Sequence, residues 1–252
     1  MGGPGRRLVG TCGFQKARRR HFESLDAVEV QQTFYDPPPG DRLKRWASEA
    51  PDWFVFTVKV WMLVTHGYNP RLWRRLRRRL PYEPASFKPF EPSEPVLWAL
   101  RETLNAAEAL GARALVFQTP ASFRASEDNA ARVEGFFREA GISGYEIYWE
   151  PRGDWWTPQG LRLLERVASR AGVSIAGDPL RGRLPPRWQE TLYARLHGLG
   201  GRGEVNYRYR YTDGDLERLK GIVEEWESAY VMFNNVYAFE DAVRFRALLL
   251  SG

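Results

Sequence analysis

Short strand-like apolar runs alternate with longer helical patterns along the whole 252-residue chain. Several of the helical patterns carry helix-start signals, as in SEDNAARVEGF and TPQGLRLLERV. Eight strands are predicted, at residues 7–12, 27–31, 53–60, 114–118, 145–150, 173–178, 192–197 and 230–234. Helices are predicted at about 40–50, 94–110, 127–140, 157–171, 213–227 and 238–250. This alternation predicts an α/β fold of the TIM-like (β/α) barrel type.

A doubly wound open sheet is the rival architecture. The predicted strands are similar in length, and no Gly-rich dinucleotide fingerprint follows the first, so the pattern favours the barrel. The links after the first and sixth strands look irregular, and GDPLRGRLPPRW after the sixth is too rich in Pro and Gly for a helix. We expect a single barrel domain over residues 1–252, with an enlarged loop at 67–93 after the third strand.

Composition narrows the class of protein. The single cysteine, Cys12, excludes an internal disulfide and a cysteine-based metal cluster. No apolar run approaches the roughly 20 residues of a membrane helix, and the first residues lack the apolar core of a signal peptide. We therefore expect a cytoplasmic protein with no membrane partner. The formal net charge of +6 is compatible with phosphate or nucleic-acid partners.

Lys59 lies inside WFVFTVKVWMLVTH, residues 53–66, one of the most apolar stretches of the chain. Side chains alternate across a strand, so Lys59 shares a face with Val55 and Thr57, opposite Phe56 and Val58. The parity predicts that Lys59 points into the barrel near the C-terminal mouth, where barrel enzymes place their active sites. A buried ammonium needs a partner, and we expect a carboxylate, with Glu29 on the neighbouring strand as the preferred one.

Most of the other predicted strands also end in polar residues. The same alternation points these residues inward near the mouth: Glu29, Gln118, Glu150, Asp178, Arg195, His197 and Asn234. Buried charges cost several kcal/mol each unless they are paired or used. A structural ion network is one explanation. A functional site is favoured because the polar groups gather at one end of the strands.

The enlarged loop reads GYNPRLWRRLRRRLPYEPASFKPFEPS and carries six arginines within residues 71–79. Leu72, Leu76 and Leu80 recur at a spacing of four, which predicts a basic helix with an apolar stripe. Such a helix either packs on the barrel with a solvated basic face or binds a polyanion. Another basic stretch, KARRRH, predicts that His21 lies on the solvated surface.

Seven ordered motifs carry a family resemblance: VEVQQTFY, FTVKVWMLVTH, LVFQTPASF, WEPRGDWW, AGDP, YARLHG and VMFNN. Over about residues 8–248 the chain resembles the domain-of-unknown-function 72 family, the YecE-like proteins. The resemblance implies a TIM-barrel-like fold, no established activity and a suggested nuclease-like or nucleic-acid role. Its recurring polar positions add Thr33, Tyr35, Thr65, His66, Arg152 and Gly198 to the residues above. Here Gly153 follows Arg152 where many members have His, and Gln32 replaces a small polar residue.

These residues divide into an anion cradle and acid/base groups. Lys59, Arg152 and Arg195 suit phosphate or carboxylate oxygens, whereas Glu150, Asp178 and His197 suit proton transfer. We expect catalysis by Lys59, Glu150, Asp178 and His197. We expect substrate binding by Arg152, Arg195, Gln118, Glu29, His66, Asn234 and Tyr35. A divalent cation held mainly by Glu150 and Asp178 is an open alternative, although no HxH or HExxH spacing signals it.

The expected activity is hydrolysis or transfer at a phosphorylated or nucleic-acid substrate. The cations would neutralise developing negative charge, with Glu150 or Asp178 as base and His197 as acid. Two alternatives remain open at this stage. One is a non-catalytic module that binds RNA or DNA, and the other is a sugar-phosphate isomerase-like enzyme suggested by fold analogy alone. In every case the expected partner is an anionic small molecule or a nucleic acid.

Overall fold

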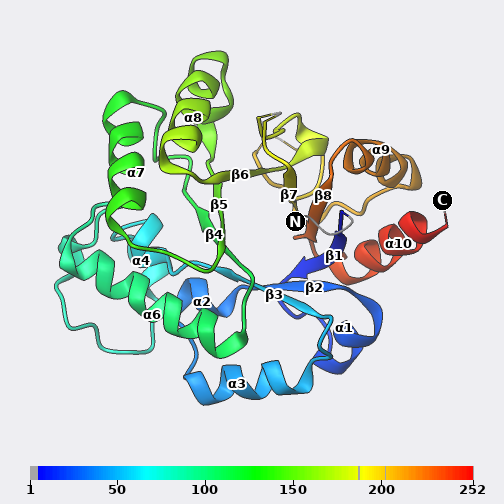
Figure 1. The fold of residues 1–252 in the computed structure, drawn as a ribbon, viewed down its shortest axis with the longest axis horizontal. Helices are drawn as coiled ribbons and strands as arrows, with labels where there is room; N and C mark the ends of the chain where they lie inside the picture. The colour runs from blue at the N-terminus through cyan, green and yellow to red at the C-terminus, as the bar shows by residue number, and fades with distance from the viewer. Residues whose placement is uncertain (1–4, 187, 202, 252) are drawn as a thin grey trace. The chain divides into compact units, whose positions relative to one another are not determined.

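The computed structural model, drawn as a ribbon in Figure 1, describes residues 5–186, 188–201 and 203–251. Its strands form a closed parallel barrel in chain order. The predicted TIM-like barrel is therefore confirmed, and the open sheet is excluded. The strands are β1 (Arg7–Cys12), β2 (Ala27–Val30), β3 (Val55–Lys59), β4 (Ala114–Gln118), β5 (Glu146–Glu150), β6 (Ser174–Gly177), β7 (Thr191–Leu196) and β8 (Ser228–Phe233).

The long helices lie where their periodicity predicts them: α3 (Gly40–Glu49), α6 (Glu94–Leu110), α7 (Glu127–Glu139), α8 (Pro158–Ala171), α9 (Asp213–Glu224) and α10 (Ala238–Leu250). Local chemistry sets their ends. The Thr212 hydroxyl and the Asp215 carboxylate form a capping box at the start of α9. Gly111 and Gly172 end α6 and α8 in the left-handed conformation. None of the helices that the structure describes is long and apolar enough to cross a membrane.

Shorter helical turns complete the fold: α1 (Arg18–Ser24), α2 (Gln32–Tyr35), α4 (Met62–Thr65), α5 (Pro70–Trp73), and the 3₁₀ turns η1 (Pro84–Ser86), η2 (Gly153–Trp156) and η3 (Pro179–Arg181). Only η3 lies between β6 and β7 among the described residues, as the Pro- and Gly-rich sequence predicts. The link after β1 was expected to be irregular, and this is wrong because α1 lies within it.

The chain divides into two compact units. The first unit holds residues up to 29, 49–55 and 175 onward, and the second holds residues 30–48 and 56–174. In the first, α9 and α10 cover β7, β8 and β1 with a core that includes Leu196, Phe233 and Phe245. In the second, the fully buried Phe90 packs against the rings of Phe117, Phe136 and Trp149. This packing holds Phe90 at a φ of 52°, a left-handed conformation that few non-glycine residues adopt.

His21 is fully buried, so its predicted place on the surface is wrong. Its ring packs edge-on against Phe14 and Phe239, with centroids 5.1 and 5.0 Å away. Its Nε2 accepts a hydrogen bond from the Gln15 backbone N–H at 3.3 Å. Burial lowers the pKa of His21. The basic neighbours in KARRRH mislead because on a helix only one face need be solvated, and His21 occupies the other.

The predicted basic helix at residues 71–79 is also wrong. Only Pro70–Trp73 is helical, and the chain then runs through turns to Leu80. Asp36 accounts for the difference, because its carboxylate accepts the Arg77 backbone N–H at 3.1 Å and the Arg78 Nε–H at 2.6 Å. These tertiary hydrogen bonds replace the backbone hydrogen bonds of a longer helix. Such a helix would have brought arginines on neighbouring turns close together.

Candidate functional site

The second unit brings five of the predicted site residues into one neighbourhood, here called the β3–β5 cluster: Lys59, His66, Gln118, Glu150 and Arg152. Lys59, Gln118 and Glu150 are the last residues of β3, β4 and β5. The strand register pairs Gln118 with Glu150, and Lys59 with Val116 two residues before Gln118. Since the period of a strand is two, Lys59 and Gln118 point to the same side of the sheet, which is what parity predicts.

Lys59 is 7% exposed, and its environment explains how the ammonium is kept there. Its Nζ donates to Gln118 Oε1 at 2.9 Å and lies 3.8 Å from the centroid of the Phe34 ring. The amide of Gln118 is oriented in turn, because its Nε2 donates to the Thr119 carbonyl at 2.8 Å. The Thr33 hydroxyl donates to the Lys59 carbonyl at 2.7 Å. A cation–π contact and an amide oxygen thus favour a charged Lys59 in a nearly water-free place.

Glu150 and Arg152 lie at the end of β5 and are 4% and 8% exposed. Arg152 Nη2 donates to Glu150 Oε1 at 3.2 Å, which makes a buried ion pair. Pro151 between them ends the strand and turns the guanidinium back toward the carboxylate. A buried pair of this kind keeps both charges at the strand end, where each can also contact a ligand.

His66 lies beside the charged groups of this cluster. Its Nδ1 lies 2.9 Å from the Thr65 hydroxyl, and its ring packs edge-on against Phe34. Burial and the charges of Lys59 and Arg152 lower the pKa of His66 to about 3, while Glu150 opposes them. The imidazole is therefore neutral near pH 7, and the two cations outweigh the one carboxylate. Such a balance favours an anion.

We expect His66 to make the protein less stable as the solution is acidified. The folded pKa of about 3 lies below the ordinary 6.5, so the unfolded chain binds more protons below pH 6.5. The contribution of neutral His66 is complete above pH 6.5 and is lost as the pH falls toward 3. Between pH 7 and pH 5 the wild type should lose on the order of 2 kcal/mol more unfolding free energy than His66→Gln. Urea unfolding at both pH values measures the difference, and parallel curves for the two proteins would contradict it.

The first unit contains a second group, the Glu29–Arg195 cluster, built from β2 and β7. Arg195 donates to both Glu29 oxygens, Nε to Oε2 at 2.9 Å and Nη2 to Oε1 at 2.7 Å. The Tyr193 hydroxyl donates to Oε2 at 3.1 Å, and all three side chains are fully buried. Glu29 was expected to pair with Lys59. The two lie in different units, so that pairing stays a prediction, and the partners described for Glu29 are Arg195 and Tyr193.

Asp178 and His197 also lie together in the first unit, each 2% exposed. Asp178 Oδ2 accepts the His197 backbone N–H at 3.1 Å, and the His197 ring lies edge-on to Tyr207. Burial and the Asp178 charge raise the pKa of Tyr211, whose hydroxyl accepts the Gly198 N–H at 2.7 Å. Sequence reasoning missed Arg181, whose guanidinium bonds the carbonyls of Gly198, Gly200 and Gly203 and holds this loop.

The remaining predicted residues lie elsewhere. The Tyr35 ring lies under the guanidinium of Arg75, a residue of the basic stretch after β3. The guanidinium carbon is 4.3 Å from the ring centroid. Asn234 is half-buried, and its backbone N–H donates to the Leu196 carbonyl. Its neighbour Asn235 is 3% exposed, and its Nδ2 donates to Asp241 Oδ2 at 2.8 Å. Sequence reasoning also missed Asn235 and Phe34. The only sequence signal for each of them is that it stands next to a predicted site residue. That all these groups share one mouth stays a prediction.

A metal site gains no support from the arrangement of ligands. Within residues 5–186, 188–201 and 203–251, no group of three or more His, Cys, Asp or Glu is arranged to hold a metal ion. Glu150 and Asp178 belong to different units, so the suggested pair of ligands stays a prediction.

Comparisons with known proteins agree with the sequence motifs. A model of the family described as "Protein of unknown function DUF72" matches residues 14–251. The UPF0759 protein YunF of Bacillus subtilis is 22% identical over 245 residues, covering 88% of this chain and 81% of that protein.

Solved structures of DUF72 proteins are similar over almost the whole chain. One from Enterococcus faecalis has a TM-score of 0.73 at 19% identity, with 98% of each chain covered. Another from Thermotoga maritima has a TM-score of 0.67 at 24% identity and covers 97% of this chain and 99% of that one. The 3-keto-D-glucoside 4-epimerase YcjR of E. coli shares the fold at a TM-score of 0.58 and 12% identity, covering 98% and 100% of the two chains.

Proposed function

This chain belongs to the DUF72 family of proteins of unknown function, and from its β3–β5 cluster we propose that it acts on a phosphorylated small molecule. The proposed reaction is hydrolysis or transfer of the phosphoester. One observation carries the proposal: two buried cations, Lys59 and Arg152, lie close enough to His66 to add to the effect of its burial, and together these lower its pKa to about 3. A cluster with this excess of positive charge at the ends of barrel strands is suited to a phosphoryl group.

Four residues of the cluster have roles in the proposed reaction. Lys59 and Arg152 contact the phosphoryl oxygens and neutralise the negative charge that develops on them in the transition state. Glu150 accepts the proton of the attacking water or hydroxyl as that nucleophile's oxygen bonds to phosphorus. The ester P–O bond breaks, and the leaving oxygen takes a proton from solvent and departs as the alcohol. Gln118 acts as a positioning residue, because it holds the Lys59 ammonium in place.

The proposal predicts that Lys59→Met weakens the binding of phosphorylated compounds about 100-fold. A charge-assisted hydrogen bond to a phosphate oxygen contributes about 1.5–3 kcal/mol, and loss of one cation also weakens the attraction of the cluster. Calorimetric titration with inorganic phosphate, sugar phosphates and nucleoside monophosphates measures the affinity. Glu150→Gln should retain the affinity but lose turnover about 10²–10⁴-fold, measured as phosphate released.

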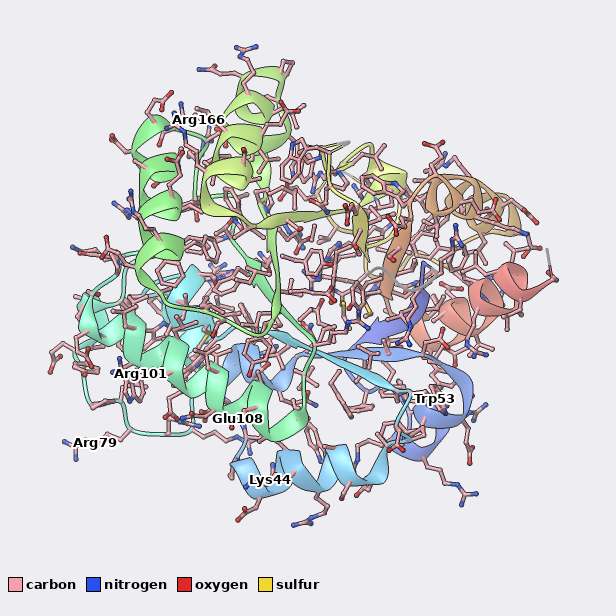
Figure 2. All side chains as sticks on the ribbon, in the orientation of Figure 1. Lys44, Trp53, Arg79, Arg101, Glu108 and Arg166 are labelled. Atoms are coloured by element: carbon pink, nitrogen blue, oxygen red, sulfur yellow. The ribbon has the colours of Figure 1, made fainter. Side chains whose placement is uncertain are left out.

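Lys44→Met is the matched control, because Lys44 is an exposed lysine on α3 (Figure 2). It removes the same charge from the second unit and should change the affinity less than twofold. The proposal is rejected if Lys59→Met binds phosphate as tightly as Lys44→Met does. Circular dichroism and thermal unfolding of each variant separate loss of binding from loss of fold.

A sugar-phosphate isomerase-like reaction is the second candidate. The shared fold with the 3-keto-D-glucoside 4-epimerase and with a xylose isomerase domain-containing protein of Salmonella typhimurium, at a TM-score of 0.55, favours it. In this reaction Glu150 would remove a proton from carbon, and the phosphate would remain attached. Exchange of substrate C–H protons with D₂O, with no phosphate released, distinguishes this reaction from hydrolysis.

A further inference from the structure

The basic segment, residues 71–79, carries more positive charge than its surroundings neutralise. Of its six arginines, Arg78 is paired with Asp36 Oδ1 and Glu102 Oε2, both at 2.6 Å. The other five are exposed: Arg71, Arg74, Arg75, Arg77 and Arg79. None of these five has a carboxylate within ion-pair distance among the described residues. Figure 2 shows Arg79 extending away from the ribbon.

The backbone of the segment is held without these five guanidinium groups. Asn69 Oδ1 accepts the backbone N–H groups of Arg71 and Leu72, and Asp36 accepts that of Arg77. The Arg78 guanidinium also lies 5.1 Å from the centroid of the Trp61 ring. Five charged side chains are thus presented from a fixed stretch of chain, so a ligand that binds them need not order the backbone.

Aromatic rings lie among these arginines. Tyr68, just before the segment, is 54% exposed, and its ring stands edge-on to Trp73 with centroids 5.0 Å apart. Trp73 is fixed in turn, because its Nε1 donates to the Gly67 carbonyl at 3.1 Å. Arg75 lies over the Tyr35 ring. The face of an exposed ring held in this way can stack on a nucleobase.

We propose that residues 68–79 form a binding surface for single-stranded nucleic acid. The exposed guanidinium groups contact successive phosphates, and one base stacks on Tyr68. Groove binding to a duplex is not favoured, because α5 ends at Trp73 and its single turn is too short to lie along a major groove. A lipid surface is not favoured either, because Leu72, Leu76 and Leu80 are partly buried and the exposed side chains of the segment are charged.

The test uses fluorescence anisotropy with a labelled 15-nucleotide oligouridine at several salt concentrations. The triple variant Arg74→Gln, Arg77→Gln, Arg79→Gln should bind at least tenfold more weakly at low salt. The slope of log affinity against log salt should fall by about 2, since three phosphate contacts are lost at about 0.7 each. Tyr68→Ala should weaken binding roughly tenfold without changing this slope, and Tyr68→Phe should retain most of the affinity.

A matched control removes three exposed arginines of the second unit from another surface: Arg132, Arg138 and Arg162, on α7 and α8. Like the five above, they have no carboxylate within ion-pair distance in the part of the chain that the structure describes. Replacing these by Gln makes the same change in net charge and should weaken binding less than threefold. Equal losses for the two triple variants would overturn the proposal, because binding would then reflect net charge alone. Tyr68→Ala with wild-type affinity would also overturn it.

Vesicles containing phosphatidylserine test the competing explanation, which is that the basic segment binds a membrane surface. Vesicle binding that is lost in the Arg74/Arg77/Arg79 variant, with no oligouridine binding by the wild type, would overturn the proposal in favour of a membrane. The test is independent of the proposed enzymatic function. The Arg74/Arg77/Arg79 variant should bind inorganic phosphate within about twofold of the wild type, so failure of the phosphate site and failure of the basic segment give different results.

Discussion

Replacing Arg195 by methionine should lower the free energy of unfolding by about 3–5 kcal/mol. The side chains of Arg195 and Glu29 are both 0% exposed, and the guanidinium donates to both carboxylate oxygens. Methionine fills much of the same volume but leaves a buried carboxylate without these two donors. Breaking a buried pair is costly because the remaining charge is still cut off from water. Urea unfolding at pH 7 measures the loss.

The double variant Arg195→Met, Glu29→Gln should regain at least half of that loss, since the orphaned charge is removed as well. Arg246→Met is the control in the same unit. It breaks a pair with Asp26 at 2.9 Å in which the arginine is 34% exposed, and it should cost about 1 kcal/mol or less. A loss below 1 kcal/mol for Arg195→Met would show that water or another group reaches Glu29, and the cluster would then not be a dry ion pair.

Gly198→Ala should destabilise the protein by about 3 kcal/mol or more. Gly198 directly follows His197, has a φ of +80°, and a Cβ built there would lie 2.1 Å from the Asn206 carbonyl oxygen. The alanine therefore adds a clash with the backbone to the strain of a left-handed conformation. Because relief of the clash must move this loop, the His197–Tyr207 ring contact should be disturbed too. Thermal unfolding and the ring chemical shifts of His197 report these two effects.

Gly200→Ala separates the two causes. Gly200 has a φ of +68°, but nothing lies within 4 Å of the Cβ position. Only the conformational strain is added, and the expected loss is about 1–2 kcal/mol. If the two alanine variants were equally stable, the close approach of Asn206 would not be what requires a glycine at position 198.

The sequence predicts the elements of this barrel well where a local pattern is enough. The strands Arg7–Cys12 and Ala114–Gln118 and the helix Glu94–Leu110 have the predicted bounds, because hydrophobic periodicity and capping chemistry act within a few residues. Parity also predicts that Lys59 and Gln118 point to the same side of the sheet, since alternation along a strand is a property of the chain itself.

The sequence is a poorer guide to which side chains the buried charged groups contact. Glu29 on β2 meets Arg195 on β7 although β1 and β8 lie between these strands in the sheet. Lys59 bonds Gln118, an amide that the sequence did not indicate as its partner. Side chains that point into a closed barrel can meet across it, so which charges pair depends on how the sheet closes, and no spacing along the chain records that.

By itself, the sequence determined the order of strands and helices and the barrel. The tertiary structure alone decided that His21 is buried among aromatic rings. It also decided that the arginine-rich segment is not helical after Trp73, because Asp36 accepts hydrogen bonds from Arg77 and Arg78. It also decided that burial, together with Lys59 and Arg152, lowers the pKa of His66. The physical reason is range. Periodicity and capping act between near neighbours in sequence, whereas burial and electrostatic coupling depend on residues that only the fold brings close.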